Sequence, residues 1–372
     1  MNNCSVKTLK LENYRNIKNC DLSFCEGINI ITGENGQGKT NLIEAIWLLT
    51  GAKSFRGSKD RDIVNRDLEG AERFARIVSV MEQEDYENKI EILVADTDSK
   101  KGRFARFNDG QPKRAVSLAG QFYCVVFCPQ HLTLVSGSPS LRRKFVDGAL
   151  CQIYPNYIKV FKTFEKYLEQ KNSLLKNQNR YYFEEFNGTL DIYNRHLAAL
   201  GYEIYLKRKE YIDLMREKAK EYYRQISGGR ESIDFEYLSF GTQAEDFYSG
   251  LVDSIEQDKR AGFSTCGVQR EDIEIKIDGT SAKDFASQGQ QRSIVLAMKL
   301  AESDILQQIC EVKPVILLDD VLSELDFGRQ EYLLNNIEGK QVFISSCDEN
   351  RINLSGSRKY FVKNGSVEQA DG

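Results

Sequence analysis

The feature that most constrains the fold is a glycine-rich segment near the start of the chain, Gly33-Glu34-Asn35-Gly36-Gln37-Gly38-Lys39-Thr40, with the spacing G-x-x-x-x-G-K-T. Residues 28–32 before it form a short β-rich run, and residues 41–50 after it form an apolar stretch that Gly51 can end. We therefore predict a buried strand, a tight loop and a helix in this order. A chance match in a glycine-rich turn is the alternative, and the flanking strand and helix argue against it.

A loop between a strand and a helix suits the binding of a phosphate. Its glycines let the backbone turn N–H groups inward, and the helix N-terminus adds a partial positive charge. Lys39 would reach the β- and γ-phosphates of ATP, and Thr40 would ligate Mg²⁺. Arg15, one predicted hairpin earlier, either contacts a phosphate or is an ordinary surface residue. The loop residues predicted to contact the nucleotide are Gly33, Glu34, Asn35, Gly36, Gln37, Gly38, Lys39, Thr40 and Asn41.

A second motif follows the apolar run Val315–Leu318, which predicts a strand buried on both faces. The run ends in Asp319 and Asp320. Beside a phosphate loop, Asp319 would hold Mg²⁺ through water and Asp320 would polarise the attacking water, since phosphoryl transfer needs positioning and charge. Without the loop, the same residues would indicate only a strand that ends in a solvated acidic turn.

A third motif, Ser287-Gln288-Gly289-Gln290-Gln291-Arg292, directly precedes a predicted helix over residues 293–301. Ser287 or Gln288 would cap this helix, and Gly289 permits close approach of the backbone to an anion. Taken alone, the motif is typical of a capped helix. Its position shortly before the acidic strand links it to the nucleotide site.

Together these motifs resemble the SMC-like class of ABC-type ATPases, and most closely the RecF family of bacterial recombination mediators. The resemblance extends from end to end of the chain, over residues 11–16, 53–56, 137–147 and 319–326. It implies an α/β fold, namely an ABC-type P-loop ATPase head with an antiparallel β-subdomain and a helical, coiled-coil-like insertion domain.

The resemblance also implies roles for single residues. Ser287, Gly289 and Gln290 would contact the nucleotide that the P-loop of a second subunit holds, and residues 323–326 would cross the dimer interface. Residues 345–348 would act as the switch for the γ-phosphate. The implied catalytic residues are Asp320, Gln130 and Lys39, and the implied metal ligands are Thr40, Asp319 and Gln130. Asp320 stands where transporter-type ATPases have glutamate, and the shorter side chain suits slow hydrolysis.

Net charge limits the way in which this protein can meet DNA. The formal charge of the 372 residues is −4, which excludes a uniformly basic nucleic-acid coat, so DNA binding needs a local patch. The candidate clusters are Lys53, Arg56, Lys59 and Arg61, then residues 142–144, and then residues 207–209. Each is also explained by a solvated face, and residues 142–144 by pairing with acidic residues inside the fold. The resemblance favours the first cluster, which we predict to bind DNA.

Cysteine and histidine usage argues against a zinc site. The nine cysteines include no C-x-x-C pair, and His131 and His196 are the only histidines in the sequence. Reduced thiols fit the cytosol. No apolar run approaches the length of a membrane span, and the N-terminal residues lack a signal pattern. We therefore expect a soluble, cytoplasmic protein with no membrane partner.

The hydrophobic period changes along the chain. Residues 75–80 and 89–94 alternate like antiparallel strands, whereas apolar residues recur at helical spacing from about residue 149. There we expect two long antiparallel helices, an irregular stretch from residue 227 to about 263, and a strand at 273–277. The predicted domains are residues 1–148 with the P-loop, 149–263 as the helical insertion, and 264–372 with the signature and the acidic strand.

These interpretations lead to an expected function. The resemblance implies a protein that dimerises on ATP and Mg²⁺, binds double-stranded or gapped DNA, and hydrolyses ATP slowly as a weak DNA-dependent switch. It would act with a RecR-type mediator in recombinational repair of gapped or stalled replication DNA. The alternative is an SMC-like ATPase that regulates a partner nuclease. A transporter ATPase is disfavoured because the insertion between the P-loop and the signature is too long.

Overall fold

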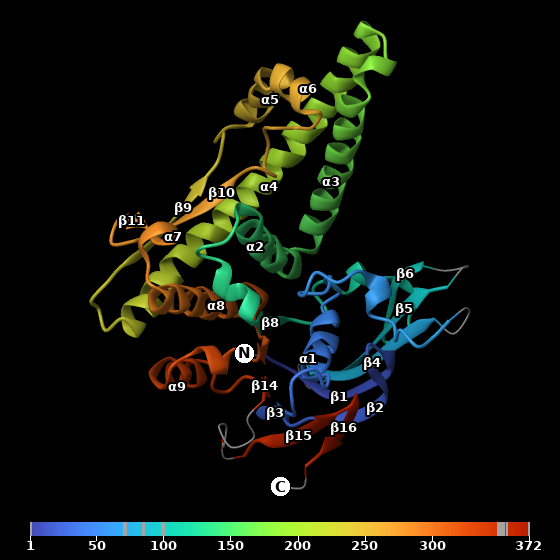
Figure 1. Ribbon diagram of the computed structural model, residues 1–372, viewed down its shortest axis with the longest axis vertical. Helices are drawn as coiled ribbons and strands as arrows, with labels where there is room; N and C mark the ends of the chain where they lie inside the picture. Colours follow the sequence, from blue (N-terminus) through green and yellow to red (C-terminus); the bar gives the residue numbers. More distant parts are fainter. Residues whose placement is uncertain are drawn as a thin grey trace. The chain divides into compact units, whose positions relative to one another are not determined.

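The structure is a computed structural model that describes residues 2–69, 73–83, 86–97, 101–347, 354 and 356–370. The chain divides into two compact units, residues 1–133 with 295–372, and residues 134–294. The first unit holds a mostly parallel sheet and a mostly antiparallel sheet, and the second holds the long helices (Figure 1).

The mostly parallel sheet of the first unit has the strand order β16-β15-β3-β14-β13-β8. Its strands are β3 (Ile28–Thr32), β8 (Cys124–Phe127), β13 (Val315–Asp319), β14 (Val342–Ser346), β15 (Arg358–Lys363) and β16 (Ser366–Gln369). β16 runs antiparallel to β15, and the other neighbours in this order are parallel. Every residue of β13 is buried, which confirms the predicted strand buried on both faces.

The second sheet of this unit is antiparallel except where β12 pairs with β1. Its strands are β1 (Asn2–Tyr14), β2 (Ile17–Ser23), β4 (Phe74–Gln83), β5 (Tyr86–Asp96), β6 (Lys101–Phe107), β7 (Lys113–Arg114) and β12 (Val312–Lys313). β4 pairs antiparallel with β5, so the strands predicted at residues 75–80 and 89–94 are confirmed.

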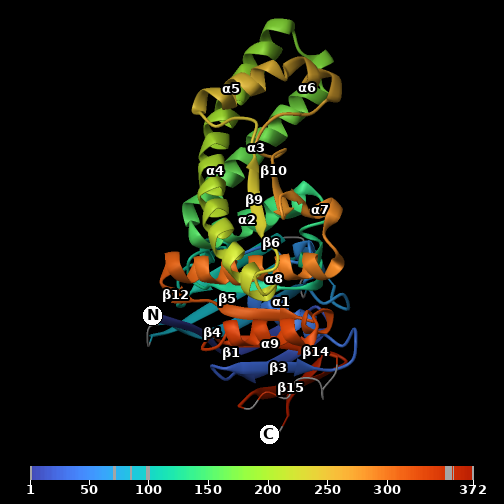
Figure 2. The same cartoon turned by 90° about the vertical axis from the view of Figure 1, so that its left-hand side faces the viewer.

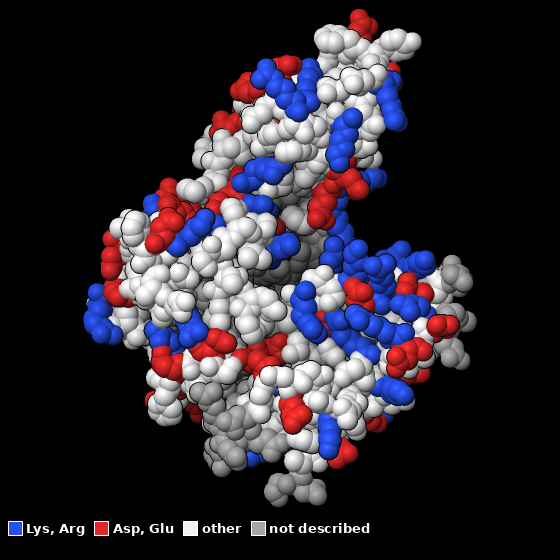
Figure 3. Space-filling view, viewed as in Figure 1, with Lys and Arg blue, Asp and Glu red and all other residues white. Residues whose placement is uncertain are grey.

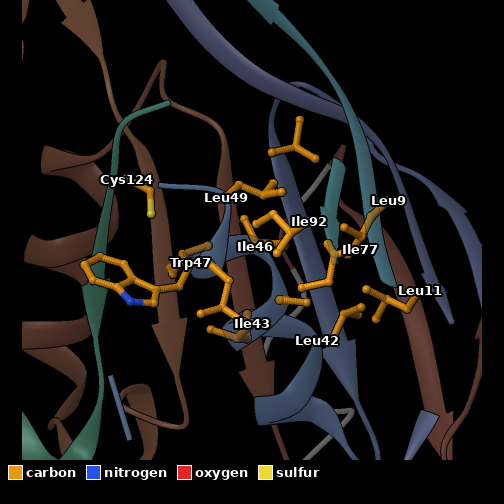
Figure 4. Close-up of a cluster of buried hydrophobic side chains, with 14 of the residues drawn as sticks. Leu9, Leu11, Leu42, Ile43, Ile46, Trp47, Leu49, Ile77, Ile92 and Cys124 are labelled. Carbon is orange, nitrogen blue, oxygen red and sulfur yellow. The ribbon is translucent and has the colours of Figure 1, made fainter. Parts of the chain in front are cut away.

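Helix α1 (Lys39–Leu48) lies between the two sheets, and its residues from Leu42 to Leu48 are all buried (Figure 4). Leu42 and Ile46 face Leu9 and Ile77 of the antiparallel sheet, whereas Trp47 points to the opposite side, toward β8. Each large apolar side chain buried in this way stabilises the fold by about 1.5–3 kcal/mol. This packing holds the first turn of α1, and with it the end of the glycine-rich loop, in one position.

Several helices complete the first unit. They are α9 (Phe327–Asn336), the later part of α8 (Gln288–Cys310), and the 3₁₀ helices η1 (Asp60–Asp62), η3 (Ala115–Leu118), η4 (Pro129–Thr133) and η6 (Leu322–Glu324). The division between the units falls within α8, because it lies between residues 294 and 295. Across the residues that the structure describes, helices that combine the length and apolar character of a membrane span are absent.

The second unit is built on two long helices, α3 (Pro155–Lys176) and α4 (Phe183–Ile226), which run side by side (Figure 2). The 3₁₀ helix η5 (Gln178–Arg180) joins them, and α2 (Pro139–Ile153) precedes them. Their apolar stripes pack together, as the helical spacing indicates. The predicted pair of antiparallel helices is confirmed.

The prediction of irregular structure from residue 227 to about 263 is wrong. This stretch contains β9 (Ile233–Leu238), α5 (Ala244–Asp253) and α6 (Ile255–Ala261). β9 pairs antiparallel with β10 (Asp272–Ile277), the strand predicted at 273–277, and β10 pairs with β11 (Thr280–Ser281) before α7 (Ala282–Phe285). Elements this short carry few hydrophobic repeats, and tertiary contacts such as the buried Lys171–Asp258 ion pair at 2.8 Å hold them.

One arginine of each of two basic clusters, Arg142 and Arg208, is buried and paired inside the second unit. Arg142 is buried and donates two hydrogen bonds of 2.8 Å to the carboxylate of Asp272, which confirms the predicted pairing inside the fold for Arg142, whereas Lys144 is exposed. Arg208, also buried, donates to both carboxylate oxygens of Asp147 at 2.8 and 2.9 Å. Bidentate pairs of this kind fix geometry and leave these guanidinium groups unavailable to a phosphate.

The unit boundaries differ from the predicted domain boundaries. The predicted divisions after residues 148 and 263 both fall inside the second unit. α2 groups with this unit because it packs on α3, α4 and β10, and β10 pairs with β9. The three-part division into residues 1–148, 149–263 and 264–372 stays a prediction.

The Arg208–Asp147 pair provides a test of the packing in the second unit. Arg208→Met leaves the Asp147 carboxylate with the Tyr157 hydroxyl, at 2.7 Å, as a partner. Breaking a buried pair costs roughly 3–5 kcal/mol, so we expect the free energy of unfolding to fall by about that amount in urea denaturation. Lys209→Met, which removes an exposed ion pair with Asp213, should cost about 0.5 kcal/mol or less. Equal free energies of unfolding for Arg208→Met and Lys209→Met would contradict a stabilising role of the buried Arg208–Asp147 pair.

Candidate nucleotide-binding site

The carboxyl ends of four neighbouring parallel strands meet at one edge of the sheet in the first unit. β3 leads into Gly33, β14 ends at Ser345 and Ser346, β13 ends at Asp319, and β8 leads toward Gln130. The register pairs Asp319 with Ser345. Ligands of open α/β sheets bind outside this edge, so the topology brings together segments that are far apart in the sequence.

Lys39 turns its side chain back into the glycine-rich loop. Its ammonium donates to the backbone carbonyls of Gly33 at 2.9 Å and Glu34 at 3.1 Å, and it lies 3.4 Å from the Sγ of Cys347. The side chain is buried, and Cys347 in turn donates to the Oδ1 of Asn35 at 2.7 Å. Among the described residues the recorded partners of this buried ammonium are neutral, which favours binding of an anion inside the loop.

The loop is gripped at Gln37 from both ends of the chain. The side-chain amide of Asn16 and the backbone N–H of Gly365 donate to the Gln37 carbonyl at 2.8 and 3.1 Å. The N–H of Asn364 donates to the Gln37 side chain at 2.6 Å. Figure 1 shows the C-terminal strand β15 beside β3, which precedes the loop, and β16 pairs with β15 on its other side. The turn between β15 and β16 therefore pre-organises the loop for its ligand.

Thr40 and Ser345 converge on one carboxylate oxygen. Both hydroxyls donate to the Oδ1 of Asp319, each at 2.9 Å. Burial raises the pKa of Asp319, and the hydrogen bonds from Ser345 and Thr40 offset part of that rise. Hydroxyl and carboxylate oxygens are the ligands that Mg²⁺ prefers, so Thr40 and Asp319 fit the metal site predicted for them.

Asp320 occupies a strained backbone position next to this pair. Its φ of 51° lies in the left-handed region, which costs a non-glycine residue about 1–3 kcal/mol. Its N–H donates to the Ser345 hydroxyl at 2.9 Å, and its carbonyl accepts from the Ser323 hydroxyl at 2.7 Å. The Asp320 carboxylate lies 3.7 Å from the Sγ of Cys347, which places it beside the loop. Its role in polarising water, and the catalytic role of Lys39, stay predictions.

Arg15 contacts the helix that follows the loop. Its guanidinium donates to both oxygens of Glu44 at 2.6 and 2.7 Å, to Ser58 at 2.9 Å and to the carbonyl of Asp62 at 3.1 Å. Burial favours a higher pKa for Glu44, but hydrogen bonds from Arg15 and Ser54 outweigh it and lower that pKa. Arg15 thus ties α1 to the segment after it, and its contact with a phosphate stays a prediction.

Gln130 lies in η4, directly after β8, with an exposed side chain. Its carbonyl accepts a hydrogen bond from the Thr133 hydroxyl at 2.8 Å, so the local turn is closed. The strand register places η4 at the same sheet edge as Asp319. The sensing of Mg²⁺ and water by Gln130 stays a prediction.

The signature residues form a helix cap in the second unit. The N–H of Gln290 donates to the Ser287 hydroxyl at 3.2 Å, and the N–H of Ser287 donates to the Gln290 side chain at 2.7 Å. This capping box resolves the choice between Ser287 and Gln288 in favour of Ser287. Gln290 also donates to Glu231 at 2.8 Å, and the carbonyl of Gly289 accepts from Ser293 at 3.1 Å. Contact of these residues with the nucleotide of a second subunit stays a prediction.

The remaining basic cluster lies on the segment between α1 and β4, where Lys53, Arg56, Lys59 and Arg61 are all exposed. Figure 3 shows Lys and Arg side chains gathered on the first unit, where Figure 1 places the loops near α1, β5 and β6. Arg56 donates to the side chain of Asn41, at the start of α1, at 2.9 Å. This hydrogen bond links the basic segment to the helix that carries Lys39 and Thr40.

Two carboxylates of the same segment form contacts within the protein. Asp60 pairs with the buried Arg103 at 3.0 Å, and the carboxylate of Asp62 accepts from the N–H of Lys59 at 3.1 Å. Four further exposed cations lie on β6 and β7 and had no signal in the sequence, namely Lys101, Arg106, Lys113 and Arg114. β6 contacts the segment through Arg103, which pairs with Asp60 and donates to the Ala52 carbonyl at 2.6 Å.

Comparisons with known proteins bear on this site and fold. The family model described as the RecF/RecN/SMC N terminal domain matches residues 5–367. The DNA replication and repair protein RecF of Lactobacillus acidophilus is 34% identical over 373 residues, covering 96% of this chain and 97% of the relative. The chain belongs to the RecF family of DNA replication and repair proteins. RecF of Clostridium acetobutylicum is 37% identical over 344 residues, covering 91% and 92% of the two chains.

Solved structures agree with this membership. The structure of the recombination mediator protein RecF with ATP, from the RecFOR pathway, superposes with a TM-score of 0.89 at 32% identity and covers 99% of this chain and 98% of its own. The Smc head domain from Pyrococcus furiosus shares the fold, with a TM-score of 0.54 at 16% identity, covering 99% and 96% of the two chains. The predicted resemblance and the predicted ABC-type ATPase head are confirmed.

Sequence reasoning missed the residues that grip the loop. Asn364 and Gly365 stand in an ordinary turn pattern, and nothing local signals their contact with Gln37. Cys347 and Ser345 were predicted as part of the γ-phosphate switch, and the structure places both at the site. Asp348 of the same predicted switch lies outside the described residues.

The raised pKa of Asp319 predicts a stability effect of Asp319→Asn, because burial disfavours the ionised carboxylate. At pH 7 without nucleotide or Mg²⁺, we expect the variant to melt at a higher temperature than the wild type by calorimetry. A raised folded-state pKa means that the wild type regains stability as the pH falls, so the difference should narrow toward pH 5. In ATP and Mg²⁺ the order should reverse. A variant less stable than the wild type at pH 7 with EDTA would contradict this account.

The turn that grips Gln37 predicts an effect of Gly365→Ala on nucleotide binding. Gly365 has a φ of 76°, and an added Cβ would lie 2.0 Å from the backbone oxygen of Asn16. We expect nucleotide affinity, measured with a fluorescent ATP analogue, to fall by about tenfold, which corresponds to about 1.4 kcal/mol. Gly279→Ala is the matched control, because its φ of 80° carries the same backbone strain with open space around it. Equal nucleotide affinity of Gly365→Ala and Gly279→Ala would contradict a role of the turn between β15 and β16 in positioning the loop.

Proposed function

We propose that this protein is an ATP-gated clamp on DNA. It binds ATP and Mg²⁺ at the sheet edge, dimerises on the nucleotide, and holds double-stranded DNA at gaps or stalled replication sites until slow hydrolysis releases it. The observation that carries the proposal is the convergence of Lys39, Thr40, Asp319 and Ser345 beside an exposed basic segment that is tied to the same helix.

The nucleotide half of the proposal rests on the loop and its partners. The loop N–H groups and Lys39 would neutralise the β- and γ-phosphates, and Lys39 would exchange its two carbonyl partners for phosphate oxygens. Thr40 and Asp319 would hold Mg²⁺, which supplies charge neutralisation between the phosphates. Asp320 would orient the attacking water. Its short side chain suits slow hydrolysis, which sets how long the ATP-bound state lasts, more than rapid turnover. ATP in the relative from the RecFOR pathway supports this assignment.

The DNA half rests on the basic segment. Lys53, Arg56, Lys59 and Arg61 are exposed, Asp60 pairs with Arg103 outside the segment, and Asp62 lies 3.9 Å from Arg61, so among the described residues four cations face one acidic group that has no partner outside the segment. Cations on one face bind the phosphate backbone without reading sequence, which suits a protein that recognises a structure in DNA. The hydrogen bond from Arg56 to Asn41 connects the basic segment to α1, the helix that carries Lys39 and Thr40. Nucleotide binding at α1 can therefore affect the basic segment.

Dimerisation completes the proposal. Ser287, Gly289 and Gln290 of one copy would close on the nucleotide held by the other, as the resemblance implies. The relative described in the RecFOR pathway supports a RecR-type mediator as partner, and the expected place of action is the cytoplasm, on chromosomal DNA. The enzyme activity is then a weak, DNA-dependent ATPase used as a switch.

Anisotropy of a fluorescent duplex, titrated with protein in ATP–Mg²⁺ and in ADP–Mg²⁺, tests the clamp. We expect at least about tenfold tighter binding with ATP, and loss of this difference in Lys39→Ala, which removes the loop cation. Lys59→Glu with Arg61→Glu should weaken binding in both nucleotides. Lys209→Glu, an exposed cation in the second unit, should leave it unchanged. Equal binding in ATP and ADP would separate the ATP site from DNA capture.

Ser287→Arg tests the dimer separately. It should leave binding of a fluorescent ATP analogue intact, because Ser287 lies outside the P-loop, and it should abolish the ATP-dependent dimer in sedimentation. Dimers that persist in Ser287→Arg would contradict the action of the signature on a second copy.

A further inference from the structure

Two strongly exposed phenylalanines adjoin the segments predicted to act across the dimer. Phe327 is 79% exposed and directly follows Asp326, the last residue of the predicted interface loop 323–326. Phe285 is 73% exposed and lies just before Ser287, the cap of the signature helix. Scattered apolar residues are normal on a protein surface, so what calls for explanation is the position of these two.

Phe327 has no role in forming its own helix. The N-cap of α9 is Asp326, whose carboxylate accepts from the N–H of Arg329 at 3.0 Å, and the buried side chain of α9 is Leu333. Gly328 beside it has no side chain to cover the ring. Phe327 is the first residue of α9 and stays in solvent, where a polar residue would serve the fold equally well.

The loop before Phe327 is held by side-chain hydrogen bonds to its backbone and by two buried leucines. The side chain of Gln330 donates to the carbonyls of Leu322 at 2.6 Å and Leu325 at 2.9 Å, and Ser323 donates to the carbonyl of Asp320. Leu322 and Leu325 are buried and anchor the loop. An apolar side chain held on a rigid loop loses little conformational entropy when a partner covers it.

Phe285, in the second unit, is likewise an exposed apolar side chain on a segment held by hydrogen bonds. It ends α7, whose buried side chain is Ala282, so the phenylalanine contributes little to its own element. The next residue is held by a hydrogen bond of 3.0 Å from the side chain of Gln291 to the carbonyl of Ala286, and Ser287 is held by its capping box. Phe285 is therefore presented on a fixed segment beside the signature.

We propose that Phe285 and Phe327 are apolar anchors that a second copy of this chain buries when ATP closes the dimer. The proposal rests on the proposed function, because it takes the segments 287–290 and 323–326 as parts of the interface. Each copy carries a net charge of −4, so long-range electrostatics opposes their association. Burial of aromatic side chains is independent of that repulsion, and such side chains are frequent hot spots of interfaces.

Sedimentation velocity in a slowly hydrolysed ATP analogue with Mg²⁺ measures the dimer dissociation constant. We expect Phe285→Ala and Phe327→Ala each to raise it by about tenfold or more, and Phe327→Leu, which keeps apolar area, by less than about threefold. Phe183→Ala is the matched control, because Phe183 is 77% exposed at the start of α4 and adjoins neither segment. All variants should bind a fluorescent ATP analogue as the wild type does at concentrations where it is monomeric.

The outcomes distinguish failure of the proposed apolar anchors from failure of the proposed ATP-gated clamp. If both alanine variants dimerise like the wild type while Ser287→Arg stays monomeric, the anchors are overturned and the clamp stands. If Phe183→Ala weakens the dimer equally, the effect is general loss of apolar surface and the anchors are again overturned. If the wild type itself stays monomeric with the analogue and Mg²⁺, both the anchors and the ATP-dependent dimer are overturned.

Discussion

The burial of α1 between two sheets is the constraint on which the rest of the first unit depends. Residues Leu42 to Leu48 have no solvent face, so the helix cannot rotate or slide without exposing apolar surface on one side or the other. The helix begins at Lys39 and continues with Thr40, and its position therefore sets where the ammonium and the hydroxyl lie. The apolar packing of α1 therefore fixes the positions of the groups that would bind the nucleotide at the sheet edge.

The site then adds strained and charged groups that the packing can tolerate. Asp319 is a buried carboxylate whose pKa burial raises, and Asp320 holds a left-handed backbone conformation. Both cost stability in the ligand-free protein, and both are held by Ser345. A cation and a triphosphate would relieve the first of these costs, which is a physical reason for nucleotide to stabilise one state of the protein.

Positive charge is used in two ways in this chain. Arg142 and Arg208 are buried and paired with Asp272 and Asp147, so they organise the second unit. The cations around Arg56 stay exposed, and of the two acidic residues of their segment only Asp60 pairs elsewhere, with Arg103. The three basic clusters look alike in the sequence, and burial alone separates a structural arginine from one that can meet a phosphate.

Much of the fold followed from periodicity. The strands at residues 75–80 and 89–94, the helix after the P-loop and the two long helices all carry enough repeats to be recognised. The elements between residues 227 and 263 were missed, and β9 depends on a partner distant in sequence, β10. Short strands were recognised where a motif or a clear alternation marked them, as at β13 and β10.

The sequence by itself determined the chemistry of the site, because the glycine spacing, Lys39, Thr40 and the acidic end of β13 are local motifs that a phosphate and Mg²⁺ require. It also determined family membership, since those motifs recur together along the whole chain. Only the tertiary structure decided that Gly365 and Asn16 grip the same loop residue, that Arg15 faces Glu44, and which cations stay in solvent. These are contacts between residues distant in sequence, and no local propensity encodes them.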